Sequence, residues 1–387
     1  MILSYCTNIH PAETWAETFY AVQTHVLKVR DKLLASCEHP HSQPFPIGLR
    51  LSAVAARELL TADHLPRFAD WLIENNSFVF TINGFPYGSF HGTRVKEQVF
   101  LPDWTDPARI AYTKQLFEIL AKIAPKSSGG SVSTLPGSHK TFHADETTIC
   151  KNLISIAHFI DDLSQKHQID LHLGLEPEPL GHFENTTETL AFFENLNSQS
   201  NHSPVVRDRI GLNFDTCHFA IEFDDAAKSL DAIHQAGIRL SKIHLSNALA
   251  LDPRDPLAIA AIRPFDEPTY FHQVIARRPD HSLERFLDLP LFLSALDSGQ
   301  SLASDFTEAR VHFHIPLDAT PAAPLSSTRH HVEQTLVWCH NNPNICQHFE
   351  IETYTWGVLP GNLQRPVEDQ IAAEFSWVHR HVNSLKS

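Results

Sequence analysis

Paired cysteines, long apolar runs and basic residues are all scarce in this 387-residue sequence. Its six cysteines include no CxxC pair, so the sequence favours neither a disulfide framework nor a thiolate zinc cluster. No run approaches the roughly 18 apolar residues of a membrane span, and no basic stretch precedes an apolar one at the N-terminus. We therefore expect a cytoplasmic protein with free thiols and without membrane insertion.

Acidic residues outnumber basic ones, since 30 Lys and Arg stand against 45 Asp and Glu and give a formal charge of −15. This charge repels a phosphate backbone, so nucleic acid is not an expected partner. With 42% hydrophobic and 19% charged residues, the chain is apolar enough to fold around a large core. Because it lacks a flexible Gly/Ser linker, we expect a single domain over residues 1–387.

Short β-rich runs alternate with longer amphipathic stretches, which is typical of parallel strands joined by helices. The predicted strands are Ile2–Thr7, Ile47–Ser52, Phe78–Asn83, Ser131–Leu135, Ile169–Glu176, Ile210–Asp215, Ser241–Leu245 and His348–Thr353. Helical spacing predicts helices at Ala12–Leu33, Thr61–Glu74, Pro107–Ile123, Thr147–His167, Thr187–Leu196, Ala226–Ala236, Arg329–Asn341 and Pro366–Leu385. Eight such units predict an α/β protein with a closed (β/α)8 TIM barrel.

A ninth strand-like run, Val311–Ile315, follows a proline-rich segment at about residues 248–310. This segment is much longer than the roughly 2–6 residues of an ordinary βα loop. We interpret it as an insertion that forms an elaborated loop after the seventh strand. Because the loops that follow barrel strands build the active site, the insertion is expected to cover or shape that site.

Four predicted strands carry an acid or a histidine at or next to their last residue, which a structural core does not need: Glu176, Asp215, His244 and Glu352. The C-terminal strand ends of a barrel converge on one mouth, so these side chains are expected to meet there. Three carboxylates and one imidazole suit Mn²⁺, Zn²⁺, Co²⁺ or Mg²⁺, and a cation also offsets the repulsion between the carboxylates. For each residue taken singly, a helix cap or an ordinary ion pair is the competing interpretation.

Two further glutamates, Glu178 and Glu350, lie two residues from Glu176 and Glu352 and share a strand face with them while the strand lasts. Pro177 is expected to end the fifth strand, and Glu352 lies nearer to the C-terminal end of the eighth. These arguments favour Glu176 and Glu352 as ligands and leave Glu178 and Glu350 as the alternatives.

These residues lie in motifs that resemble a known family. DTCHFAIE (Asp215–Glu222), LEP (Leu175–Pro177) and HLSN (His244–Asn247) are similar to strand-end motifs of ketose 3-epimerases and related sugar isomerases in the xylose-isomerase-like barrel superfamily. The resemblance implies that the four residues at the strand ends bind a divalent metal ion. It also implies that His218 lies near substrate or a second metal.

Further segments resemble the EboE family of metabolite traffic proteins. They are CTNIHPAETW (Cys6–Trp15), NGFPYGSFHG (Asn83–Gly92), VKEQVFLPDW (Val95–Trp104), STLPGSHK (Ser133–Lys140) and ETYTWGVLP (Glu352–Pro360). This resemblance implies a cytoplasmic, enzyme-like barrel that moves or matures a metabolite.

Other candidate residues lie in two segments. Asn83, Tyr87 and His91, which follow the third strand, are predicted to bind substrate, although a turn packed by its own aromatic rings is an equal interpretation. His312 and His314 are candidates for a second metal or for substrate contact, because nucleases of the same superfamily bind additional zinc ions through an acid and a histidine spaced two apart.

The leading hypothesis is therefore the isomerisation or epimerisation of a polyhydroxylated carbonyl compound such as a sugar, sugar phosphate or polyol derivative. Glu176 and Glu352 would act as acid and base in an enediolate proton transfer, with His218 nearby. The alternatives are metal-dependent hydrolysis of a phosphoester, as in endonuclease IV-like enzymes, or of an amide, and a metabolite-binding barrel without turnover. The sequence leaves the substrate and the oligomeric state open.

Overall fold

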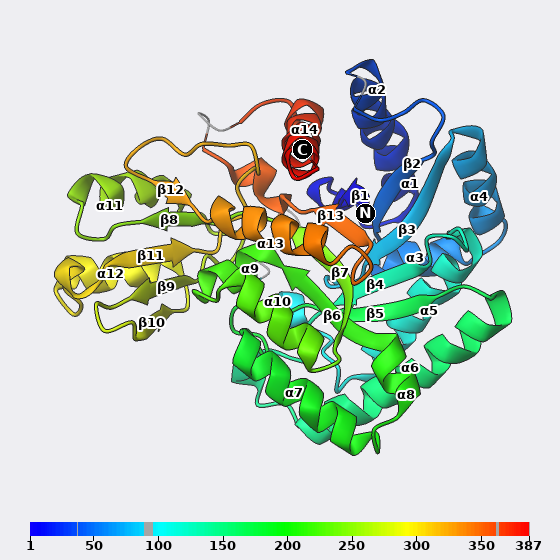
Figure 1. The fold of residues 1–387 in the computed structure, drawn as a ribbon, viewed down its shortest axis with the longest axis horizontal. Helices are drawn as coiled ribbons and strands as arrows, with labels where there is room; N and C mark the ends of the chain where they lie inside the picture. Colours follow the sequence, from blue (N-terminus) through cyan, green and yellow to red (C-terminus); the bar gives the residue numbers. More distant parts are fainter. Residues whose placement is uncertain (37, 89–95, 361–363, 387) are drawn as a thin grey trace.

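A sheet of eight parallel strands forms the centre of the computed structural model, which describes residues 1–36, 38–88, 96–360 and 364–386 (Figure 1). The strands are β1 (Ile2–Tyr5), β2 (Phe45–Arg50), β3 (Ser77–Asn83), β4 (Gly130–Thr134), β5 (Leu171–Leu175), β6 (Ile210–Asp215), β7 (Arg239–Leu245) and β13 (His348–Ile351). Their order is β1-β13-β7-β6-β5-β4-β3-β2, and a bridge between Cys6 and Gly48 joins the edges at β1 and β2. The predicted (β/α)8 barrel is confirmed.

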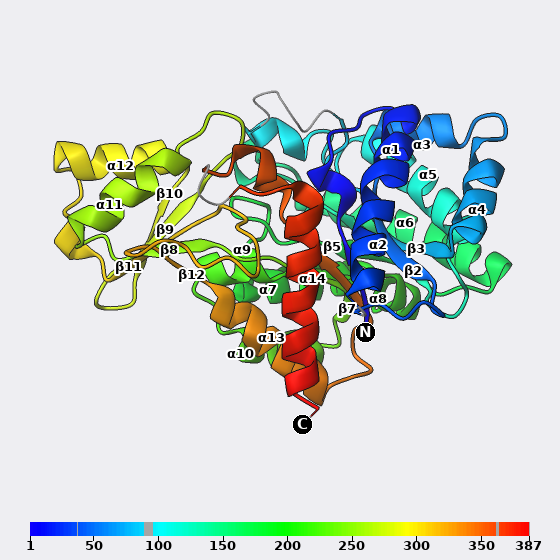
Figure 2. The same cartoon turned by 90° about the horizontal axis from the view of Figure 1, so that it is seen from above.

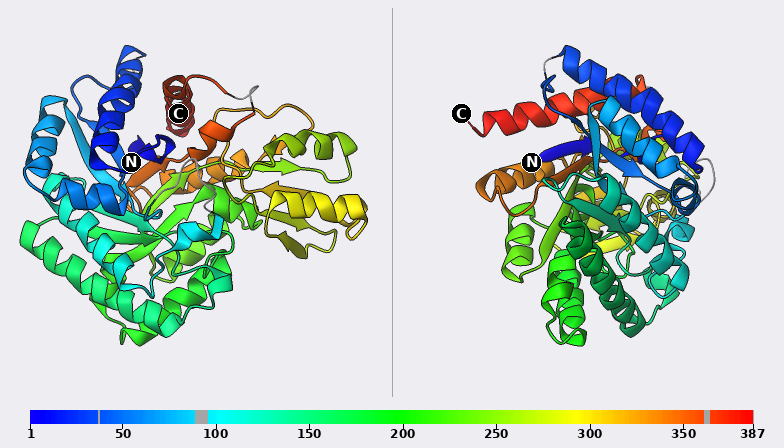
Figure 3. Two further views of the ribbon diagram at one scale, coloured as in Figure 1. Left: turned by 180° about the vertical axis from the view of Figure 1, so that it is seen from behind. Right: turned by 90° about the vertical axis from the view of Figure 1, so that its right-hand side faces the viewer.

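Helices pack around the outside of this barrel (Figure 3). They are α1 (Trp15–Ala21), α2 (Leu27–Ala35), α3 (Ala53–Leu59), α4 (His64–Glu74), α5 (Pro107–Ile123), α6 (Glu146–His167), α7 (Thr186–Gln199), α8 (Pro204–Arg209), α9 (Thr216–Ile221), α10 (Ala226–Gln235), α13 (Arg329–Asn341) and α14 (Val367–Ser384). Local signals start several of them: Asp106 caps α5 ahead of Pro107, and Asp145 caps α6 by accepting two backbone N–H bonds. In the described part of the chain, no helix has the length and apolar character needed to cross a bilayer.

The helical segments differ from the predicted ones in several places. The predicted helix Ala12–Leu33 is divided by a π-helical turn at Val22–Val26 into α1 and α2. Short 3-10 helices that the periodicity did not indicate lie at Thr7–Ile9, Lys96–Phe100, Lys140–Phe142, Arg263–Phe265, Ala303–Asp305 and Tyr354–Val358. Several of these follow barrel strands and therefore lie on the side of the barrel where the strands end.

The long segment between β7 and α13 forms a second, antiparallel sheet that projects to one side of the barrel (Figures 1 and 2). Its elements are β8 (Leu249–Leu251), α11 (Pro256–Ile262), β9 (Val274–Arg277), β10 (Leu283–Phe286), α12 (Leu289–Ser298), β11 (Glu308–Val311) and β12 (Ser326–Ser327). The strand order is β10-β9-β11-β8-β12, so the inserted sheet extends beyond Arg310.

The strand-like run at Val311–Ile315 overlaps an observed strand only at Val311. The strand β11 ends at Val311 and pairs with β9 and β8, not with the barrel. Beyond it, the backbone N–H of His312 donates to Gln273 and that of Ile315 donates to Asn247, each over 2.9 Å. Single hydrogen bonds of this kind hold the chain where it returns from the inserted sheet to the mouth of the barrel, and residues 312–315 form no strand.

Charged and aromatic contacts fasten the inserted sheet to the barrel. Arg285 of β10 forms an ion pair with Glu222, which follows α9, and its Nε lies 3.5 Å from Glu184 Oε1. The ring of Phe223 contacts two guanidinium groups of the sheet, with Arg277 Cζ at 4.6 Å and Arg310 Cζ at 4.0 Å from its centroid. The inserted sheet is therefore held beside the ends of β5 and β6.

Candidate functional site

The four predicted ligands meet at the mouth of the barrel. Glu176 directly follows β5, Asp215 is the last residue of β6, His244 lies near the end of β7 and Glu352 directly follows β13. One ligand atom from each of the four lies within 4.8 Å of the others, and all four residues are buried. From His244 Nδ1 the distances are 3.0 Å to Glu176 Oε1, 3.4 Å to Glu352 Oε2 and 3.6 Å to Asp215 Oδ2.

The polar atoms at this centre fit a divalent cation. Glu176 Oε2 and Asp215 Oδ2 are buried and accept no hydrogen bond from the residues that the structure describes. Leaving a buried carboxylate oxygen without a partner is costly, and a cation between the carboxylates would remove both that cost and their mutual repulsion. Carboxylate oxygens with one imidazole nitrogen suit Mn²⁺, Zn²⁺, Co²⁺ or Mg²⁺.

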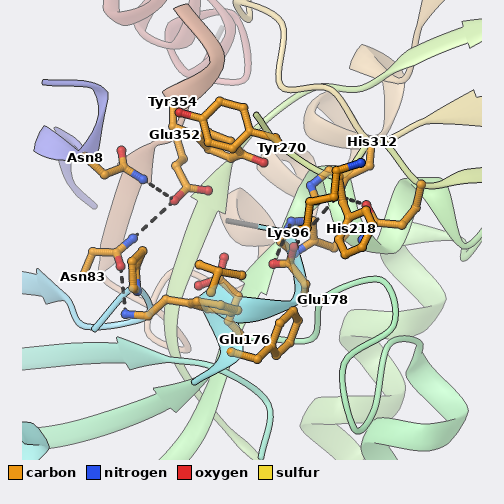
Figure 4. A pocket seen from close by; sticks show the side chains of 16 residues that line it. Asn8, Asn83, Lys96, Glu176, Glu178, His218, Tyr270, His312, Glu352 and Tyr354 are labelled. Carbon is orange, nitrogen blue, oxygen red and sulfur yellow. Dashed lines mark hydrogen bonds and ion pairs between the residues drawn. The ribbon is translucent and has the colours of Figure 1, made fainter. Parts of the chain in front are cut away.

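Neighbouring groups orient two carboxylates of the centre, those of Asp215 and Glu352. Asp215 Oδ1 accepts hydrogen bonds from the backbone N–H groups of Cys217 (2.7 Å) and His218 (3.1 Å), so this residue also caps α9. The cap and the ligand interpretations of Asp215 are therefore compatible, because the two functions use different oxygens. Glu352 Oε1 accepts from the side-chain amides of Asn8 (2.9 Å) and Asn83 (3.3 Å), as Figure 4 shows.

A buried ion pair lies beneath His244 in the barrel interior. Glu350 Oε2 lies 3.0 Å from His244 Nε2 and 2.6 Å from Lys242 Nζ, and both side chains of the pair are at most 1% exposed. Burial alone would raise the pKa of Glu350, but Lys242 and His244 bring it down to about 2. Gly48 leaves room for this carboxylate, since a Cβ there would lie 1.9 Å from Glu350 Oε1.

This ion pair bears on the choice between neighbouring glutamates. The Nε2 side of the His244 ring faces Glu350, whereas Nδ1 faces the other three carboxylates. Glu350 therefore contacts the imidazole from the side away from the centre. This is the position of a carboxylate that orients a ligand histidine, not that of a fourth carboxylate ligand.

A second cluster of titratable groups adjoins the first. His218 Nε2 lies 3.6 Å from Glu178 Oε2, and His312 Nε2 lies 3.2 Å from His314 Nε2. Ligand atoms of Glu178, His218 and His312 come within 4.8 Å of one another, as do those of Asp215, His218 and His314. Burial raises the pKa of Glu178 to about 8, and nearby carboxylates, chiefly Asp215, raise that of His218 to about 9 against the opposing effect of burial.

A pocket opens above both clusters (Figure 4). Glu176, Glu178, His218, His312 and Glu352 lie at its base, and Asn8 and Asn83 are on the side of β1 and β3. The inserted segment also lines this pocket through Tyr270, Phe271 and Gln273. An ion pair between Lys96 and Asp288 joins the segment after β3 to the inserted segment.

Of the predicted substrate-binding residues, some lie at the pocket and others do not. Asn83 lines the pocket. His314 is not among the lining residues, and its Nδ1 lies 2.9 Å from the backbone oxygen of Glu352. Tyr87 is not brought to the pocket, because its ring packs against Tyr112 at 5.1 Å between centroids. His91 lies outside the described residues.

Sequence reasoning missed Asn8, Lys242 and the orienting position of Glu350. Asn8 does lie directly after the first strand, inside a segment singled out by resemblance, and that position was an available signal. Lys242 had no such signal, because a lysine inside an apolar strand has no distinguishing feature until its buried partner is known.

The eight parallel strands and the converging strand ends define a (β/α)8 barrel. No family model and no curated protein matches the sequence. Among solved structures, the chain is similar to a D-tagatose 3-epimerase-like protein, with 8% identity over 100% of this chain and 98% of that one, and a TM-score of 0.50.

Two further solved structures are similar at lower scores. One is the probable 3-DHS dehydratase AsbF of Bacillus anthracis, with 13% identity over 97% of this chain and 98% of that chain, and a TM-score of 0.46. The other is the IolI protein with a bound zinc atom, with 12% identity over 99% of both chains and a TM-score of 0.47. At such identities the likeness concerns the fold alone.

Proposed function

We propose that this chain is a divalent-metal-dependent isomerase or epimerase that acts on an α-hydroxycarbonyl compound, the unit found in sugars and sugar phosphates. The observation that carries the proposal is the convergence of Glu176 and Glu352 with Asp215 and His244 at one buried centre. The resemblance to the EboE family adds a role in maturing or moving a metabolite in the cytoplasm.

The chain's own residues supply the proton transfer. A bound divalent ion would polarise the substrate carbonyl and make the adjacent C–H more acidic. Glu352 takes the proton from that carbon, and Glu176 returns one to the other side of the substrate. Burial alone would raise the pKa of Glu352, but His244 holds it below its ordinary value, so the carboxylate is ionised at neutral pH and able to accept a proton.

Asn8 and Asn83 position the base. Both amides donate to Oε1 of Glu352, which leaves Oε2 directed to the centre. Holding a catalytic carboxylate in one orientation lowers the entropic cost of reaching the transition state. His218 lines the same pocket, and its Nε2, which has no hydrogen-bond partner among the described residues, is in position to contact a substrate hydroxyl group.

Two substitutions separate metal binding from proton transfer. Asp215→Asn is expected to weaken metal binding and activity together. Glu352→Gln keeps an oxygen donor of similar shape, so it is expected to retain part of the metal affinity while the rate falls by roughly 10²–10⁴-fold, the usual value of acid–base assistance. Metal content by elemental analysis and exchange of a substrate C–H with deuterated solvent measure the two effects. Native exchange rates in metal-loaded Glu352→Gln would rule out this residue as the base.

A second candidate function is metal-dependent hydrolysis, favoured by the cluster of Glu178, His218 and His312 beside the first centre. Two metals in adjacent sites would activate water for attack on a phosphoester. Two equivalents of tightly bound metal, together with no C–H exchange for any α-hydroxycarbonyl compound, would favour hydrolysis. One equivalent of metal without exchange or hydrolysis would favour a metabolite-binding barrel.

A further inference from the structure

The pocket above the carboxylates has two chemically different parts. Its base is made of ionisable groups, whereas its upper part is lined largely by aromatic and aliphatic side chains. These are Phe85, Val99, Phe100, Tyr270, Phe271 and Tyr354. They come from the segment after β3, from the inserted segment and from the segment after β13. Three separate segments of the chain therefore contribute to this apolar lining.

Several polar groups that line the pocket already bond to the protein, and the buried atoms without a hydrogen-bond partner among the described lining residues, Asn8 Oδ1, Glu176 Oε2 and His218 Nε2, belong to residues around the carboxylate centre. The amide nitrogens of Asn8 and Asn83 donate to Glu352. Gln273 donates to Pro179 over 3.2 Å, and its Oε1 lies 2.7 Å from His312 Nδ1.

A polyol with hydroxyl groups on every carbon needs a partner for each of them, and burying a hydroxyl against aromatic rings without a partner is unfavourable. The upper part of the pocket therefore favours a group that has no hydroxyls.

The aromatic side chains of the lining pack against one another and against Lys96. Phe85 and Phe100 pack edge to face with centroids 5.5 Å apart, and Tyr270 and Tyr354 do the same at 5.2 Å. Lys96 Nζ lies 5.0 Å from the centroid of Phe271.

The same ammonium group is held by Asp288, whose Oδ1 also accepts from the backbone N–H groups of His272 and Leu289. The aromatic rings are thus fixed before a ligand binds, so a flat ligand would meet little ordering cost.

We infer that the substrate carries an aromatic ring on its α-hydroxycarbonyl unit and is not a free polyol. The two oxygens would lie at the carboxylate centre, and the ring would occupy the part of the pocket lined by Phe85, Phe100, Tyr270 and Phe271. The orientation of the oxygens rests on the proposed function. The preference for a ring rests on the lining residues.

Hydroxamates of three kinds test the inference, because they share one metal-chelating head and differ only in the attached group. Benzohydroxamate, acetohydroxamate and gluconohydroxamate carry a ring, a methyl group and a polyol. Their dissociation constants are measured by calorimetry on the zinc-loaded full chain. Benzohydroxamate is expected to bind at least roughly tenfold more tightly than acetohydroxamate, since the ring leaves water for an apolar pocket. Gluconohydroxamate is expected to bind no more tightly than acetohydroxamate.

Matched variants locate the preference in the pocket. Phe271→Ala is expected to reduce the ratio between benzohydroxamate and acetohydroxamate affinities by at least roughly threefold. Leu291→Ala, an exposed position on α12, serves as the control and should leave that ratio unchanged. Equal affinities for the ring and methyl compounds, or tightest binding of gluconohydroxamate, would overturn the inference.

Failure of the proposed function can be distinguished from failure of the aromatic preference. A chain that binds no metal contradicts the proposed chemistry but still has the pocket. In that case 2-hydroxyacetophenone and dihydroxyacetone are compared on the metal-free chain by ligand line broadening in NMR spectra. Selective broadening of 2-hydroxyacetophenone that weakens in Phe271→Ala would support the aromatic preference, and equal behaviour of both ligands would refute it.

Discussion

Glu350→Gln is the substitution that most directly tests how the barrel interior supports the candidate centre. The variant keeps the shape of the side chain and removes its charge. Lys242, whose side chain is 1% exposed, then loses the carboxylate that lies 2.6 Å from its ammonium group. The same change replaces the carboxylate beside His244 Nε2 with a neutral amide.

Two magnitudes follow from this geometry. Breaking a buried ion pair by removing one partner costs about 3–5 kcal/mol, because the other charge stays buried without compensation. That is a large share of the roughly 5–15 kcal/mol by which folded domains are stable. Loss of the group that orients a ligand histidine lowers metal affinity by about 10–100-fold. The variant is therefore expected to be less stable without metal and also to bind metal more weakly.

A double variant separates these two effects. Lys242→Met with Glu350→Gln removes both charges, and replacing a whole buried pair by neutral groups is often without cost. Urea unfolding in the presence of a chelator should place the double variant within about 1 kcal/mol of the native chain. Metal titration should show that its affinity remains low, because His244 still lacks the carboxylate.

Either of two results would refute this reasoning. Native unfolding and native metal affinity in Glu350→Gln would show that the buried pair does not support the centre. Equal destabilisation of the single and double variants would show that the loss comes from altered packing and not from the unpaired charge of Lys242.

Three further predictions concern the interior and the titration of the chain. Gly48→Ala should lower the unfolding free energy by about 1–3 kcal/mol, because the added Cβ would lie 1.9 Å from Glu350 Oε1; an unchanged urea midpoint would contradict this. Burial raises the pKa of Glu374 from 4.5 to about 7. The contribution of this residue to the free energy of unfolding is therefore fully present below pH 4.5 and is lost as the pH rises through 7. Over these 2.5 pKa units the loss is about 3 kcal/mol, and Glu374→Gln should lack this dependence when unfolding is compared at pH 5 and pH 8. Burial alone would lower the pKa of His244, but the surrounding carboxylates hold it well above its usual value. Metal binding at pH 7 should therefore release about one proton, which calorimetry in two buffers measures. A release of zero protons would contradict His244 as a metal ligand.

The barrel could be predicted because its signals are local. Each predicted strand overlaps an observed barrel strand, since runs of apolar residues are required wherever both faces of a parallel strand are covered. The meeting of Glu176, Asp215, His244 and Glu352 also followed from topology alone, because parallel strands in a barrel all end at the same mouth.

Long-range partners could not be predicted in the same way. Glu350 and Glu352 are two residues apart and have the same chemistry, and only the position of Lys242 and the missing side chain of Gly48 show that Glu350 faces inward, below His244. The antiparallel pairing of the inserted strands was also hidden, because its short strands lie between prolines and their partners are far along the sequence.

The inserted segment provides side chains that line the pocket. It supplies Tyr270 and Phe271 to this lining, and the chain that leaves its sheet brings His312 next to His218. The barrel strands provide a centre of carboxylates that would serve many oxygen-bearing substrates, so discrimination has to come from groups farther from the reacting atoms. Since those groups lie largely on the inserted segment and on the segment after β3, changes in these two segments should alter which substrate is accepted while the carboxylate centre stays the same.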